Sequence, residues 1–94
     1  MTERIEITDE LLDRLELMDR AGTPGDWKAM IEGRDHTSGD SFILAFDGSR
    51  QVDIYVYYDR EPASGSDLDL IAAARSLLPS LVAEIRTLRS NRPK

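Results

Sequence analysis

The sequence contains no cysteine, one histidine and few aromatic residues, which make up 6% of its 94 residues. The lack of cysteine excludes disulfide bonds, thiol nucleophiles and thiolate metal sites. No apolar run approaches the roughly 18–20 residues that a membrane-spanning helix needs, and the first residues lack the basic start and apolar stretch of a secretory signal. We therefore expect a cytoplasmic single domain over residues 1–94, frayed at 1–6 and 90–94, with no cofactor, no metal and no membrane contact.

Basic residues are fewer than acidic residues. Twelve lysines and arginines against 18 aspartates and glutamates give a net charge of −6. This balance argues against direct binding of a nucleic-acid backbone. Residues 1–66 hold 15 acidic and 7 basic residues, whereas residues 67–94 hold 3 acidic and 5 basic ones. An acidic body with a basic end is compatible with head-to-tail contacts or with a basic partner.

Residues 9–21 are predicted to form the first helix, because apolar residues recur at helical spacing after a threonine in the N-cap position. Gly22 is expected to end this helix as a left-handed cap. The next turn contains Pro24, Gly25 and Trp27 and has the chemistry of a structural corner. We expect the Trp27 ring to fill the end of the core rather than to stack on a ligand.

Three strands with period-two patterning are predicted after this turn, at residues 27–32, 41–46 and 51–58. A polar loop at 33–40 joins the first two, and Asp47-Gly48 is a hairpin signal between the second and the third. The sequence therefore predicts a three-stranded antiparallel β-meander.

Alternation along these strands assigns residues to the two faces of the sheet. The core face is predicted to hold the even-numbered apolar residues, which are Phe42, Leu44, Phe46, Val52, Ile54, Val56 and Tyr58. The outer face is predicted to hold odd-numbered residues, which are Ile43, Ala45, Asp53, Tyr55 and Tyr57. A small sheet with two helices is expected to have only one face well covered, so the outer group stays accessible.

A long apolar helix is predicted from Ser66, the expected N-cap, with Asp69 completing a pair that resembles a capping box. Pro79 removes one backbone hydrogen bond, so we expect a kink near Leu78. This helix has apolar residues on two stripes, which indicates deep burial or an interface shared with a partner. A homodimer interface is predicted on the second stripe, at Leu70, Leu77, Leu81 and Leu88. The predicted fold class is α+β, with both helices on one face of the meander.

Two segments resemble a known family. Residues 22–27 read Gly-Thr-Pro-Gly-Asp-Trp, which is similar to the Ala-Thr-Pro-Gly-Pro-Trp signature of the ead-like proteins, small proteins encoded in phage and prophage early regions. Residues 69–75, Asp-Leu-Ile-Ala-Ala-Ala-Arg, with Leu-Pro at 78–79 and Leu-Arg at 88–89, resemble the second hallmark of that family. The resemblance implies a phage or prophage gene product that acts inside a bacterium, in a family without an agreed biochemical activity.

The outer-face group of Ile43, Asp53, Tyr55 and Tyr57 is the best candidate for a protein-binding site. Tyrosine offers apolar area and a polar tip at small entropic cost, which suits interfaces. The alternative is that the protein's own C-terminal helix or a second copy of the chain covers this patch. Binding to another protein and self-association carry equal weight at this point.

Residues with catalytic or ligating chemistry form no recognised set. His36 has only loop aspartates near it in the sequence and is expected to be solvated. Ser38 and Ser41 are not part of a nucleophile elbow, and the glycines form no phosphate-binding sequence. The arginines near the C-terminal end are explained by the dipole of the helix that carries them.

The sequence therefore predicts a non-enzymatic interaction protein. Together with the resemblance, it favours a phage-encoded inhibitor of a host protein, of the anti-defence or anti-CRISPR type, that uses an acidic surface with tyrosines. The alternative is a small-ligand protein that sequesters a signalling nucleotide, with Arg75 or Arg86 as anion contacts near a subunit boundary. An enzyme has no motif in its favour.

Overall fold

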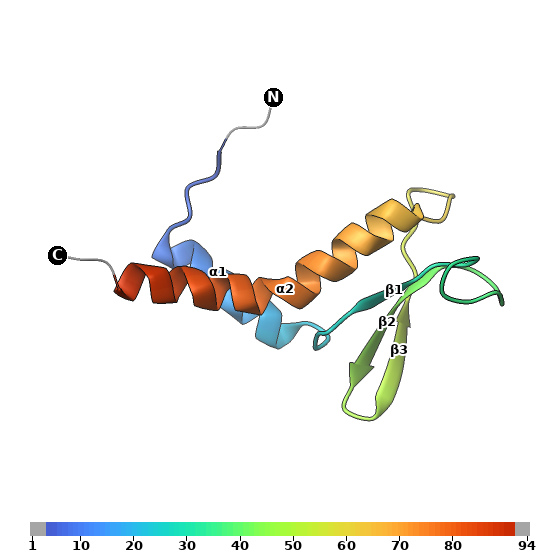
Figure 1. Cartoon of the computed structure of the whole chain (residues 1–94), viewed down its shortest axis with the longest axis horizontal. Coiled ribbons are helices and arrows are strands. Elements are labelled where there is room, and N and C mark those ends of the chain that lie inside the picture. The colour runs from blue at the N-terminus through green and yellow to red at the C-terminus, as the bar shows by residue number, and fades with distance from the viewer. Residues whose placement is uncertain (1–3, 92–94) are drawn as a thin grey trace.

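The computed structural model describes residues 4–91, in which a helix is followed by three strands and a second helix (Figure 1). These elements are α1 (Asp9–Ala21), β1 (Lys28–Met30), β2 (Phe42–Asp47), β3 (Arg50–Ile54) and α2 (Gly65–Ser90). The predicted α+β fold is therefore confirmed. Of the ends expected to fray, residues 1–3 and 92–94 lie outside the described residues, and α2 is regular as far as residue 90.

The helix α1 has the predicted bounds. The Thr8 hydroxyl accepts a hydrogen bond from the Leu11 N–H at 3.1 Å, which satisfies one of the free donors of the first turn. The Gly22 N–H donates to the Met18 carbonyl at 3.0 Å. Gly22 itself has φ −84° and ψ 173°, so the expected left-handed cap is wrong. The chain leaves α1 in an extended conformation, which carries it straight to the turn at Pro24.

The three strands pair antiparallel in the order β1-β2-β3. Two of them are shorter than predicted, since β1 spans three residues and β3 ends at Ile54. Asp47 pairs with Arg50, so the hairpin loop has two residues, of which Gly48 has φ 66°. Glycine adopts this left-handed conformation at little cost, which suits a tight hairpin.

The register of this hairpin corrects the predicted faces of β2. A two-residue loop pairs an odd-numbered residue with an even-numbered one, so Ile43 lies opposite Ile54 and Ala45 opposite Val52. Directly opposed residues share a face, and both Ile43 and Ala45 are 0% exposed. Their predicted outer position is therefore wrong. The same register moves three residues predicted for the core to the outer face, namely Phe42, Leu44 and Phe46.

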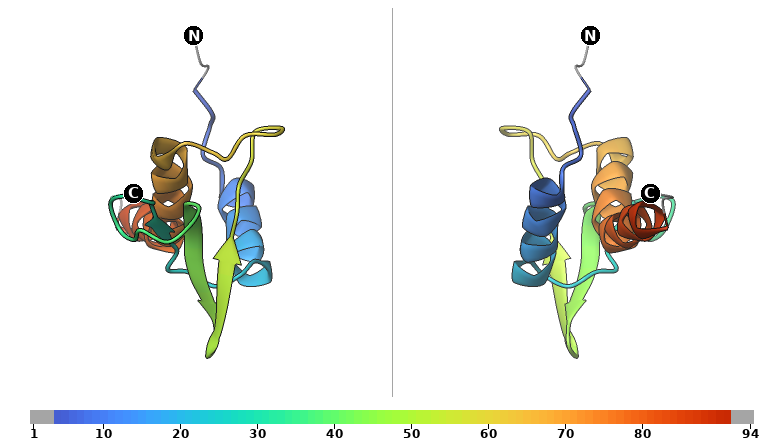
Figure 2. Two further views of the ribbon diagram at one scale, coloured as in Figure 1. Left: turned by 90° about the vertical axis from the view of Figure 1, so that its right-hand side faces the viewer. Right: turned by 90° about the vertical axis from the view of Figure 1, so that its left-hand side faces the viewer.

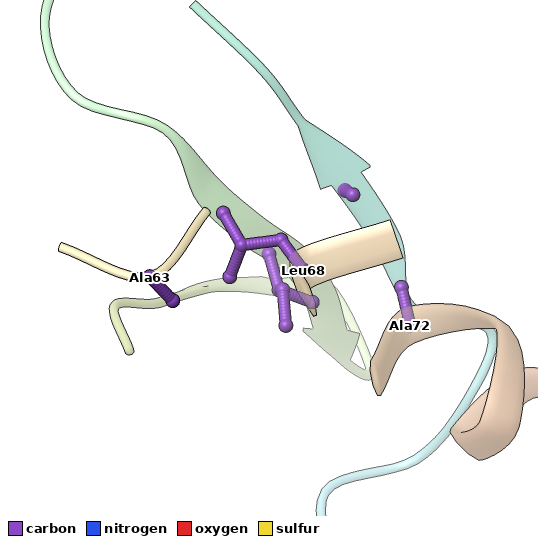
Figure 3. Packing of buried hydrophobic residues seen from close by; sticks show 5 residues of the cluster. Ala63, Leu68 and Ala72 are labelled. Carbon is purple, nitrogen blue, oxygen red and sulfur yellow. The ribbon is translucent and has the colours of Figure 1, made fainter. Parts of the chain in front are cut away.

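The core lies between α2 and the sheet face that carries Ile43. Figure 3 shows this cluster, in which Leu68 of α2 points toward the strands. Its five buried members are Ala29, Ile43, Ala63, Leu68 and Ala72. Three of the five are alanines, and such small side chains let the helix backbone approach the sheet closely.

The N-cap of α2 lies two residues before the predicted one. Ser64, and not Ser66, is the N-cap, and its hydroxyl accepts a hydrogen bond from the Asp67 N–H at 3.1 Å. The Tyr58 hydroxyl accepts from the Ser64 N–H at 2.9 Å and donates to the Asp67 carboxylate. Tyr58 is 45% exposed, so its predicted place in the core is wrong, because its ring tip belongs to the helix start.

Pro79 lies inside α2, which continues through it as one helix. Figure 1 shows that the two halves of α2 run in different directions, which is the kink expected from the lost backbone hydrogen bond. The N-terminal half lies over the sheet and the C-terminal half lies beside α1 (Figure 2).

The helix α1 packs only against α2 among the helices and strands of the described chain. The prediction that both helices cover the sheet is therefore wrong, because the inward face of α1 is already covered by α2, where Leu12 and Val82 are buried. The molecule is elongated as a result. Its radius of gyration is 16.3 Å, whereas about 12–13 Å is expected for a compact chain of this length.

Candidate functional site

The sheet face opposite α2 is the candidate functional surface, and we call it the outer face. It carries Phe42, Leu44 and Phe46 of β2, with Asp53 directly opposite Leu44. Tyr55 joins this group, because its ring centroid lies 5.6 Å from that of Phe42. Phe46 is 48% exposed and Tyr55 is 50% exposed. No helix or strand among residues 4–91 covers this face.

Of the four residues predicted to bind a partner, the structure brings two to the outer face. Asp53 and Tyr55 lie on it, and the Asp53 carboxylate accepts a hydrogen bond from Gln51 Nε2 at 2.9 Å. Tyr57 lies beyond the end of β3, in an isolated bridge with Pro62, and is 51% exposed. The side chain of Ile43 is buried on the opposite face of the sheet, against α2, so Ile43 is not part of the site.

The structure adds residues that the sequence analysis placed elsewhere. Phe42 and Phe46 belong to the outer face, and the His36 ring lies 5.5 Å from that of Phe42. His36 Nε2 is 3.3 Å from the Met30 carbonyl, and its Nδ1 accepts from the Ser38 N–H. His36 is thus tied to β1 instead of being simply solvated as expected. The sequence signal that places the two phenylalanines is the hairpin at Asp47-Gly48. Its two-residue loop pairs odd-numbered with even-numbered residues, so the even-numbered residues of β2 face outward.

Trp27 holds the corner between α1 and β1. Its indole N–H lies 3.1 Å from the Pro24 carbonyl and 3.2 Å from that of Thr23. Its backbone is bound on both sides by one hydroxyl, since Ser76 Oγ accepts from the Trp27 N–H and donates to its carbonyl, each at 2.9 Å. The ring packs against the core cluster. These contacts support the structural role predicted for the Pro24–Trp27 turn.

The arginines of α2 pair with the carboxylates of α1. Arg75 binds the Asp19 carboxylate and the Thr23 carbonyl, and its guanidinium lies 5.8 Å from the centre of the Trp27 ring. Arg86 is 2.8 Å from carboxylate oxygens of both Glu16 and Asp13. Arg75 and Arg86 are therefore engaged inside the molecule, which leaves the nucleotide-sequestering alternative without free anion contacts at these two positions.

Further ion pairs lie at the two ends of α2. Arg89 is 3.1 Å from the Asp9 carboxylate, and Arg34 of the 33–40 loop is 2.9 Å from the carboxylates of both Asp69 and Asp35. Hydrogen bonds from Arg34 hold the pKa of both aspartates below its usual range. Hydrogen bonds to Glu16 and Asp13 raise the pKa of Arg86. The arginines of α2 are thus paired with acidic residues of the same chain.

The four leucines predicted to form a dimer interface lie on the side of α2 that faces solvent. Their exposed fractions are 67% for Leu70, 53% for Leu77, 56% for Leu81 and 62% for Leu88. The other apolar stripe of α2 faces inward, with Leu68, Ala72 and Val82 buried. One stripe of the helix therefore builds the fold and the other stays uncovered.

A shallow depression of about 460 Å³ lies between the 33–40 loop and the segment before α2. It is lined by Glu32, Gly39, Asp40, Ser41, Pro62 and Ala63. Across residues 4–91, no three histidine or carboxylate side chains are grouped so that they could hold a metal ion. In the same part of the chain, no helix has the length and apolar character needed to cross a membrane.

Comparison with known proteins returned no match to a family model, to a curated protein or to a solved structure.

Proposed function

We propose that this protein is a non-enzymatic interaction protein that inhibits a host protein by docking its outer face onto it. One observation carries the proposal: α2 covers a single face of the sheet, and the opposite face presents Phe46 and Tyr55 with about half of each side chain exposed. Aromatic residues are enriched in the centres of protein–protein interfaces, where they bury large area with few rotatable bonds.

The chemistry of the outer face describes the partner surface. Phe42, Leu44 and Phe46 form an apolar centre, and Leu44 has a charge of each sign directly opposite it, Lys28 on β1 and Asp53 on β3. The whole chain carries a net charge of −6, which steers it toward a basic surface. We therefore expect an apolar patch on a partner protein whose surface is basic as a whole. The resemblance to the ead-like proteins adds the context of this proposal, in which a phage or prophage product in the host cytoplasm acts as an inhibitor of the anti-defence or anti-CRISPR type.

Site-specific photo-crosslinking in the host bacterium tests this proposal. A photoreactive phenylalanine analogue is placed at Tyr55 and, as a matched control, at Leu17, an α1 residue that is 59% exposed and lies away from the sheet. We expect one host protein to be crosslinked from position 55 and not from position 17. Equal crosslinking from both positions, or none from position 55, would contradict the assignment of the outer face.

A binding measurement with the crosslinked protein completes the test. The double variant Phe46→Ser with Tyr55→Ser is expected to weaken binding by about tenfold or more, because aromatic anchors dominate interface energies. Leu17→Ser is expected to bind normally. If the purified partner keeps its full activity when saturated with this protein, binding stands and the inhibitory role fails.

A further inference from the structure

The exposed side of α2 has residues at symmetric spacing about Pro79, and we call it the α2 outer stripe. Its members are Leu70, Ala74, Leu77, Leu81, Glu84 and Leu88. Leu70 and Leu88 are each nine residues from Pro79, and Leu77 and Leu81 are each two residues from it. Ala74 and Glu84 are likewise each five residues away. The stripe therefore reads with the same spacing in both directions from the middle of the helix.

The spacing within the stripe is that of a helix–helix seam. Successive members are separated by four, three, four, three and four residues, which is the alternation of the core positions in a coiled coil. The four leucines are all more than half exposed in the single chain. Monomeric proteins rarely expose large apolar patches, and here a single charged residue, Glu84, interrupts the stripe.

We propose that a second copy of this chain packs on the α2 outer stripe, antiparallel to the first, about a two-fold axis near Pro79. A symmetric dimer requires a surface that is complementary to itself. In the antiparallel arrangement Leu70 lies against Leu88 of the second copy, and Leu77 lies against its Leu81. The outer face of the sheet remains free, so this dimer is independent of the proposed function.

Charge distinguishes the antiparallel arrangement from the parallel one. A parallel pair in register places the two Glu84 carboxylates at the same level of the seam, where like charges repel. The antiparallel pair places each Glu84 against an alanine, Ala74 of the other copy. It also opposes the two helix dipoles, because the start of each helix lies beside the end of the other.

The dimer is expected to be weak. A helix of 26 residues is about 39 Å long and about 10 Å wide, so contact over its full length would bury on the order of 800 Å² in total. The kink at Pro79 makes this an upper bound. Stable interfaces usually bury about 1,200 Å² or more. We therefore expect a dimer that dissociates on dilution.

Sedimentation velocity over a dilution series tests the dimer in the intact protein. We expect a monomer–dimer equilibrium that Leu77→Glu weakens by about tenfold or more, because the change occurs twice in each dimer. Glu84→Leu is expected to strengthen it. The matched control Leu17→Glu alters an equally exposed leucine of α1 and is expected to leave it unchanged. A monomer at every concentration, or a dimer indifferent to Leu77→Glu, overturns the proposal; circular dichroism confirms that each variant is folded.

The absence of cysteine allows the orientation to be tested directly. Leu70→Cys and Leu88→Cys are prepared as separate proteins, mixed and oxidised gently. The antiparallel dimer predicts disulfides between the two variants and few within either one. Disulfides that form mainly between two copies of Leu88→Cys would show a parallel pair and overturn the arrangement.

Discussion

The two halves of α2 are held by different physical chemistry. The N-terminal half packs on the sheet through a cluster that is entirely apolar, with Leu68 and Ile43 at its centre. The C-terminal half packs on α1, where Arg86 and Arg89 bind carboxylates of α1. Arg75, just before Pro79, adds an ion pair with Asp19 near the end of α1. One helix therefore joins a small apolar core to an ion-paired contact between two helices, and the two regions should respond differently to truncation, salt and acid.

The largest effect is expected in the apolar region. Leu68→Ala removes a side chain that is 1% exposed and is expected to lower the free energy of unfolding by about 2–5 kcal/mol, through lost burial and the cavity left behind. Leu70→Ala, two residues away but 67% exposed, is the matched control and is expected to change it by less than about 0.5 kcal/mol. Urea denaturation followed by circular dichroism measures both. Similar losses in the two variants would mean that α2 is turned differently on the sheet.

A smaller effect is expected in the ion-paired region, at its most buried member. The Arg75 side chain is 12% exposed and binds both Asp19 and Thr23. Arg75→Leu is expected to cost about 2–3 kcal/mol, since charged hydrogen bonds in partly dry surroundings are lost together. Arg14→Leu, on the exposed side of α1, is the control. If Arg75→Leu unfolds at the same urea concentration as the wild type, apolar packing alone holds α1 against α2.

The exposed ion pair between Arg89 and Asp9 should contribute less to the free energy of unfolding. The Arg89 and Asp9 side chains are 35% and 79% exposed, so Arg89→Gln is expected to cost about 0.2–1 kcal/mol in dilute buffer. High salt screens such pairs, and the difference from the wild type is expected to vanish there. Urea unfolding at two salt concentrations measures this. A cost that persists in high salt would assign the role of Arg89 to packing of its stem.

The smallest effect concerns acid. Because Arg34 lowers the pKa of Asp35 and Asp69 in the folded chain, these carboxylates stabilise the fold above their unfolded pKa, and this contribution is lost as the pH falls through their folded values. In Arg34→Gln the two pKa values are expected to return toward 3.8, their ordinary value. Carboxyl NMR titration of the wild type and the variant measures them. Unchanged values for Asp35 and Asp69 would show that Arg34 does not bind them in solution.

Local sequence patterns predicted the helices and strands better than they predicted how these pack against one another. The bounds of α1 follow from its cap and its periodicity, and the order of strands follows from the hairpin signal at Asp47-Gly48. The face assignment of Ile43 was wrong although the two-residue loop already required odd-with-even pairing. The length of the loop sets which residues of the two strands share a face, so residue parity does not carry over from one strand to the next.

Other features depend on contacts between distant segments. The pairing of α1 carboxylates with α2 arginines requires the antiparallel approach of two helices, with partners up to 80 residues apart. The docking of Tyr58 on the start of α2 likewise depends on the path of the 59–63 loop, where Asp59 has φ 87°. Helical periodicity marked both apolar stripes of α2, but it could not decide which one the monomer buries.

The single tryptophan gives the protein a built-in optical reporter at the joint between its two regions. Trp27 is bound to α2 through Ser76 and lies beside Arg75, so its indole senses both the sheet side and the α1 side of the molecule. Its emission should therefore shift as soon as either region separates from α2, and comparison with far-ultraviolet ellipticity would show whether the chain unfolds in one step or loses its ion-paired end first.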